Sequence, residues 1–182
     1  MKTIWVLSAA VVMSAGCSEV STPYPVGTPV TQEQAEAFNG TWQHEEGLSH
    51  LRHAGDGKMV LAHLEWDADD GRFELTQDTL VLGRIGQATV LNFPKDDDSS
   101  RYYFVLVQLD EGAHLLAWEA AVQAFADAVG AGKIEGIFEN ANDVRITTEK
   151  VAFDAFLAEQ PLHAMFDLET PMVFRRVLDL RD

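Results

Sequence analysis

The chain has 182 residues, a length that suits one domain with a core of its own. Hydrophobic residues make up 47% of the chain and charged residues 23%, a composition that excludes an intrinsically disordered protein. Acidic residues outnumber basic ones by 29 to 13, which gives a net charge of −16. Nucleic acids and anionic lipid surfaces bind basic patches, so the charge argues against both as direct partners.

The first 16 residues are typical of a secretory signal. Met1–Thr3 carries a positive charge, and Ile4–Met13 is an apolar run that is too short to span a bilayer. The run ends in the small residues Ser14–Gly16, which a signal peptidase requires before its cleavage site, and Cys17 follows directly. The segment therefore predicts export and removal of residues 1–16.

Residues 14–17 resemble the lipobox of bacterial lipoproteins. In that family a diacylglyceryl group is attached to the cysteine, the signal is cut before it, and the new amine is acylated. The resemblance implies that Cys17 is lipidated and anchors the chain to a membrane, although Ser14 stands where the family usually has leucine. Because Ser18 and not aspartate follows Cys17, the resemblance implies the outer membrane of the cell envelope, on its periplasmic side.

The cysteine count agrees with this interpretation. Cys17 is the only cysteine of the chain, so an intramolecular disulfide is impossible. Two alternatives stay open: an ordinary cleaved signal followed by a free thiol, and an intermolecular disulfide.

Residues 17–30 form the predicted lipidated tether. They contain Pro23, Pro25 and Pro29 but no hydrophobic periodicity. We expect a semi-extended linker that holds the domain about 40 Å from the bilayer and takes no part in the core. The domain then begins at Thr31, where a capping box with Gln34 predicts a short helix.

From residue 40 to residue 118 the sequence consists of short β-rich runs separated by turn signals. The runs cover residues 48–54, 60–66, 73–75, 80–82, 88–93, 102–109 and 114–118. The run 102–109 is apolar on both faces, which predicts a central strand. Trp66 and six other aromatic residues of these runs and of the later helices are expected in the core, namely Trp42, Phe104, Trp118, Phe125, Phe156 and Phe174.

After residue 119 the hydrophobic period becomes helical. Apolar residues from Ala121 to Val129 predict a helix that ends at Gly130, and a second helix is expected between Thr148, as its cap, and Pro161. Residues 144–147 and 172–178 read as strands. We therefore predict one α+β, β-rich domain over residues 31–182, an antiparallel meander or small barrel of six to eight strands with two C-terminal helices.

The segment Phe38-Asn39-Gly40-Thr41-Trp42, which precedes the meander, resembles the opening of lipocalins. These are eight-stranded barrels that bind apolar small molecules and include bacterial lipoproteins. An arginine near the last strand of that family packs over the tryptophan, so the resemblance implies this role for Arg175 or Arg176. The helix, strand and helix over residues 119–160 depart from the family's order.

Histidines are the first candidates for metal ligands, because His44, His50, His53 and His63 lie within twenty residues. His50 and His53 fall on opposite faces of one strand, and no pair has ligand spacing. We therefore predict no metal site. Two acidic turns lack the spacing of a calcium loop; they are Asp67, Asp69 and Asp70, and Asp96, Asp97 and Asp98.

No residue is predicted to be catalytic. There is no Gly-x-Ser-x-Gly, phosphate loop or dinucleotide pattern, and the only serines after residue 30 are Ser49, Ser99 and Ser100. The leading hypothesis is a non-enzymatic envelope lipoprotein, without a cofactor, that binds a protein partner or an apolar ligand at unknown residues. The alternatives are an envelope hydrolase that uses an acidic pair and a metal-handling lipoprotein. A closed meander with an apolar cavity would favour ligand binding, and two carboxylates in a cleft would favour the hydrolase.

Overall fold

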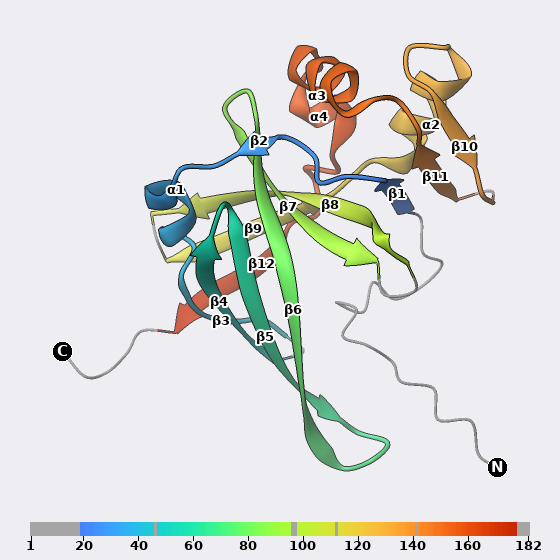
Figure 1. Cartoon of the computed structure of the whole chain (residues 1–182). Coiled ribbons are helices and arrows are strands. Elements are labelled where there is room, and N and C mark those ends of the chain that lie inside the picture. Colours follow the sequence, from blue (N-terminus) through green and yellow to red (C-terminus); the bar gives the residue numbers. More distant parts are fainter. Residues whose placement is uncertain (1–18, 46, 96–97, 112, 141, 178–182) are drawn as a thin grey trace.

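The computed structural model describes residues 19–45, 47–95, 98–111, 113–140 and 142–177. Its centre is a closed antiparallel barrel of eight strands (Figure 1). The barrel strands are β3 (Gly40–Gln43), β4 (Gly47–Gly55), β5 (Lys58–Asp67), β6 (Arg72–Ile85), β7 (Ala88–Lys95), β8 (Asp98–Asp110), β9 (His114–Glu119) and β12 (Met172–Val177). From β3 to β9 each strand pairs with the next one in sequence, and β12 closes the barrel between β9 and β3. The β-rich antiparallel prediction is confirmed in its barrel form.

One end of the barrel core is covered by helix α1 (Gln32–Glu36). The predicted capping box is present, because the Thr31 side chain accepts from the Gln34 amide and the Gln34 side chain accepts from the Thr31 amide. Ala35 and Phe38 of this segment are buried against residues of the barrel interior. The helix that the capping box at Thr31 begins therefore covers one end of the barrel core.

The segment between β9 and β12 contains α2 (Val122–Gly130), β10 (Gly136–Phe138), β11 (Asp143–Ile146), α3 (Lys150–Glu159) and α4 (Leu162–Met165). Both predicted helices form, but they are not C-terminal, because the last strand must return to close the barrel. Thr148 is not the cap of α3; it exchanges hydrogen bonds with Glu135, and Glu149 occupies the cap position. No helix among the described residues combines the length and apolarity needed to cross a bilayer.

Four strands lie outside the barrel, so the total exceeds the six to eight strands predicted. Two of them come from the expected tether: β1 (Glu19–Thr22) pairs in parallel with β11 and antiparallel with β8, and β2 (Thr28–Pro29) pairs with β6. Val20 and Val26 are buried. The interpretation of residues 19–30 as a linker is therefore wrong, and the folded body begins at Glu19 and not at Thr31.

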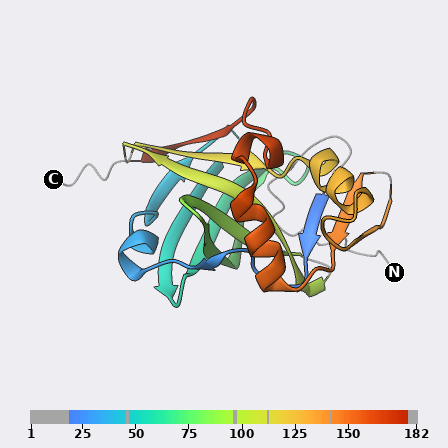
Figure 2. The same ribbon diagram turned by 90° about the horizontal axis from the view of Figure 1, so that it is seen from above.

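Contacts with distant residues explain why this segment is ordered. The buried Asn92 side chain accepts from the Val26 amide at 2.7 Å and donates to the Val26 carbonyl at 3.1 Å. Lys150 Nζ donates to the carbonyls of Pro25 and Gly27 at 2.7 and 2.6 Å. Asp154 holds Lys150 at 2.8 Å and accepts from the Gly27 amide at 2.8 Å. We call residues 19–30 the strap, because they cross the outside of β8, β7 and β6 (Figure 2).

Strand β8 separates two hydrophobic cores. Val105 and Val107 face the barrel interior, whereas Phe104 and Leu106 face a second core between the barrel wall, the strap and the helices. This arrangement confirms the prediction of a central strand that is apolar on both faces. Helix α3 lies along the outside of the barrel wall (Figure 2).

Strands β5 and β6 continue beyond their neighbours as a long hairpin (Figure 1). Trp66 on this hairpin is 53% exposed and meets Phe73, which is 67% exposed, with ring centroids 5.1 Å apart. The core placement of Trp66 is therefore wrong, because β4 begins pairing only at Gly47, opposite Glu65. Alternation in one strand cannot show where its neighbour ends.

Candidate binding site in the barrel interior

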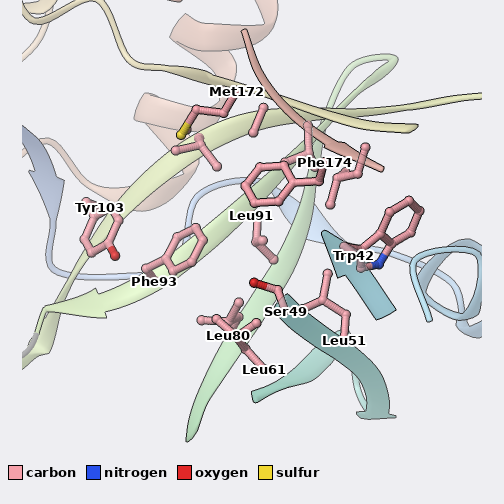
Figure 3. A pocket seen from close by; sticks show the side chains of 14 residues that line it. Trp42, Ser49, Leu51, Leu61, Leu80, Leu91, Phe93, Tyr103, Met172 and Phe174 are labelled. Atoms are coloured by element: carbon pink, nitrogen blue, oxygen red, sulfur yellow. The ribbon is translucent and has the colours of Figure 1, made fainter. Parts of the chain in front are cut away.

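The barrel interior contains a cavity of about 50 Å³, to which all eight barrel strands contribute (Figure 3). Its lining consists of Trp42, Ser49, Leu51, Leu61, Leu80, Leu91, Phe93, Tyr103, Val105, Val107, Leu115, Ala117, Met172 and Phe174. The residues alternate along each strand, as side chains that face one side of a sheet must. Apart from the Ser49 and Tyr103 hydroxyls, these side chains offer the cavity only apolar groups and the Trp42 indole.

The α1 end of the interior is closed by Trp42 and Arg176. Trp42 is fully buried, and its Nε1 donates to the Phe38 carbonyl at 3.1 Å. The Arg176 guanidinium lies 4.7 Å from the centre of the Trp42 ring and donates to the carbonyls of Ala37 and Asn39 at 2.9 Å each. Of the two arginines to which the lipocalin resemblance points, Arg176 therefore occupies the position over the tryptophan.

A row of three polar side chains, Ser49, His63 and Glu65, lies on strands β4 and β5, and Ser49 is its member that lines the cavity. The Ser49 Oγ lies 3.0 Å from His63 Nδ1, and His63 Nε2 lies 3.5 Å from Glu65 Oε2. Ser49 and His63 are only 8% and 5% exposed. The sequence did not indicate this row, because Ser49 and His63 become partners only through the pairing register of β4 and β5.

The histidines separate into two groups. His44 stacks on His63 with ring centroids 5.2 Å apart and also contacts Phe174 at 5.0 Å. His50 lies on the outer face, where its Nδ1 is 3.0 Å from Thr41 Oγ1, and His53 lies on the inner face, as their spacing predicted. Among the described residues no three His, Cys, Asp or Glu side chains gather in a metal-binding arrangement.

The acidic turn of the β5–β6 hairpin is held by its own backbone. Asp67 accepts from the amides of Asp69 and Asp70 at 2.9 and 3.1 Å, and Asp70 pairs with Arg72 at 3.0 Å. These carboxylates therefore build the turn. Cys17, the expected lipidation site, lies outside the described residues, as do Asp96, Asp97 and the side chain of Asp98.

Glu119 is an acidic residue with a shifted pKa, and Asp167 lies near it. Burial raises the pKa of Glu119 above its usual value, and the nearby Asp167 carboxylate raises it further. The pair lies where the Asp167 amide donates to the Glu119 carbonyl at 3.0 Å. The hollow beside Glu119 measures about 30 Å³, and Asp167 is not among the residues that line it, so these two carboxylates do not flank one cleft as the pair of a glycoside hydrolase would.

A wider groove of about 420 Å³ opens between α1, the β6–β7 turn, β8 and α4. Its lining consists of Gln34, Ala37, Phe38, Gln87, Ala88, Thr89, Leu106, Val107, Gln108, Leu109 and Leu162. Val107 belongs to both linings, so the groove lies directly behind the barrel cavity. None of these side chains carries a charge.

Comparison with known proteins gives no family for this chain. No profile of a known protein family, no curated protein and no solved structure matches it. The inference of function therefore depends on the barrel and its cavity.

Proposed function

We propose that the protein is a lipid-anchored envelope protein that acts without catalysis and binds a small apolar ligand inside its barrel. The observation that carries the proposal is the cavity lined by apolar side chains from all eight strands. A closed β-wall maintains such a space because its backbone hydrogen bonds are satisfied within the sheet. Arg176 over Trp42 adds the feature that the lipocalin resemblance implies.

The size of the cavity limits the ligand. About 50 Å³ is well below the roughly 300 Å³ at which pockets for drug-sized molecules begin. We propose that a slender apolar group enters and that Met172 and Phe174 move to admit it. Methionine suits this movement, because its unbranched side chain adopts many shapes at low cost.

The fold shortens the distance between the proposed lipid anchor and the folded body. With β1 beginning at Glu19, at most about 7 Å of extended chain separates Cys17 from the folded body. Lipidation of Cys17 would then hold the barrel against the membrane surface without a flexible tether. We propose the periplasmic side of the outer membrane as its place, and the membrane as its partner through the lipid alone.

The test is binding of 1,6-diphenyl-1,3,5-hexatriene, a slender, rod-shaped, uncharged probe whose fluorescence rises in apolar surroundings and which has no hydrogen-bonding group. We expect the purified protein to bind the probe and the Ala117→Leu variant, whose larger side chain enters the cavity, to bind it at least about tenfold more weakly. Ala62→Leu adds the same volume to the outer face of β5 and serves as the matched control. Equal probe binding by both variants would remove the barrel interior as the site.

A further inference from the structure

We infer that the ligand carries an uncharged head group that donates a hydrogen bond, such as a hydroxyl or an amide, and that Ser49 receives this bond. The inference rests on the proposed function, because it assigns the polar end of a ligand whose apolar part occupies the cavity. It follows from the direction of the hydrogen bonds along Ser49, His63 and Glu65.

We assign the tautomer of His63 from Glu65, whose Oε2 lies 3.5 Å from His63 Nε2. An ionised carboxylate only accepts hydrogen bonds, so the ring nitrogen that faces it, Nε2, carries the proton. The opposite nitrogen of the neutral ring, Nδ1, then has a free lone pair and accepts from the Ser49 hydroxyl at 3.0 Å. The hydrogen of Ser49 is therefore committed to His63.

Ser49 consequently faces the cavity as an acceptor. Its hydroxyl lies among the side chains of Leu91, Phe93 and Leu80 in the close view (Figure 3). Among the described residues, His63 is the hydrogen-bond partner recorded for the Ser49 hydroxyl, and in the assigned tautomer it accepts and does not donate. A ligand that supplies a donor completes the bonding of this oxygen, whereas a ligand with only acceptors leaves it unpaired.

The neighbouring groups disfavour a carboxylate head. No lysine or arginine of the described residues lines the cavity, so a buried carboxylate would have no counter-ion among them. The Nε2 proton of His63 is directed to Glu65, whose own charge repels a second carboxylate. Thr76, which is the β6 partner of His63, has a buried hydroxyl oxygen without a hydrogen-bond partner in the described part of the chain, but it does not line the cavity.

Two isomers separate head-group recognition from simple hydrophobicity: 1-octanol, which has a donor, and 1-methoxyheptane, which has the same atoms but only an acceptor. Each is used to displace 1,6-diphenyl-1,3,5-hexatriene from the full protein. We expect octanol to compete about three- to tenfold better than the ether, the equivalent of one hydrogen bond. Ser49→Ala should abolish this preference, and Ser49→Thr, which keeps the hydroxyl, should retain it.

The outcomes distinguish the two proposals. If the probe binds and Ala117→Leu blocks it, but the isomers compete equally with the unaltered protein, the head-group inference is overturned and the proposed function stands. A preference for octanol that survives in Ser49→Ala also overturns the inference. If the probe does not bind, the proposed function itself fails. Should Ser49→Ala not fold, the isomer pair on the unaltered protein decides alone.

Discussion

The two sides of strand β8 are packed in different ways. On the outside, Phe104 meets Phe125, Phe153 and Phe166 edge to face, with ring centroids 5.8, 6.3 and 6.1 Å apart. On the inside, the core is mostly aliphatic and retains a cavity of about 50 Å³. One strand thus serves a filled core with one face and an incompletely filled core with the other.

The difference follows from what surrounds each core. Helices α2, α3 and α4 are joined to the wall by loops, so they can approach it until the rings interlock. The barrel wall is held at a set diameter by backbone hydrogen bonds between all eight strands, so it cannot contract around small residues such as Ser49 and Ala117. The filled core should therefore dominate stability, and the barrel interior should tolerate changes that affect binding.

The largest expected effect tests this contrast directly. Phe153→Ala in the filled core should reduce the free energy of unfolding by about 3–5 kcal/mol, because the rings around it cannot close the space. Leu91→Ala in the cavity wall should cost about 2–3 kcal/mol, near the lower end for such a change, since part of its surface already faces empty space. Urea denaturation measures both, and a greater loss for Leu91→Ala would contradict the contrast.

A smaller effect tests whether the strap belongs to the filled core. Asp154→Ala removes the acceptor of the Gly27 amide and the partner of Lys150, so we expect a loss of about 2–3 kcal/mol. Asp127→Ala, on the exposed face of α2, removes a carboxylate whose recorded partner among the described residues is Gln123, so it should cost less than about 0.5 kcal/mol. Equal denaturation midpoints for the two variants would show that the contacts of residues 19–30 with Asp154 do not contribute to stability.

The smallest effect concerns Glu119 at the border between the two cores. Its pKa is raised in the folded state, so the folded protein binds the proton more tightly than the unfolded chain does. The stabilisation by this proton is present below the usual pKa of 4.5 and is lost as the pH rises through the folded value. Glu119→Gln should therefore raise the melting temperature at pH 7 by at most about 3 °C, because the side chain is only partly withdrawn from solvent and its charge is screened.

The same comparison at low pH provides the check on Glu119. Below the usual carboxyl pKa both forms are uncharged, so the difference between Glu119→Gln and the unaltered protein should disappear. Glu159→Gln, on the exposed side of α3, is the control substitution. A gain at pH 7 that persists unchanged in acid would show that the charge of Glu119 is not its cause.

Local signals in the sequence were sufficient for much of the fold. The capping box at Thr31, the alternation along β5 and the two apolar faces of β8 each depend on neighbouring residues, and each was predicted. The strap was missed because its order depends on Asn92, at sequence separation 66, and on still more distant residues of α3. A few valines between prolines carry no periodic pattern, so distant partners decide their structure.

The candidate binding site also has one part that local sequence patterns predict and one part that they do not. Its apolar wall follows from strand alternation, whereas the polar row requires the register that places Ser49 opposite His63. The meeting of His44 with His63 also depends on how the β3–β4 turn folds. The alternation of side chains between the two faces of a strand does not show which residues of adjacent strands become partners.

The seam between β3 and β12 determines when the molecule can fold. Residues 41–43 pair with residues 175–177, so the barrel stays open until nearly the whole chain is available. Contacts of such long sequence separation slow folding, and until they form, β3 and β9 each present an unpaired edge that invites aggregation. A ribosome or a translocation channel that delivers the chain from its N-terminus releases the closing strand last. We therefore expect closure of the barrel to be a late step of folding, because residues 41–43 and 175–177 must both be available.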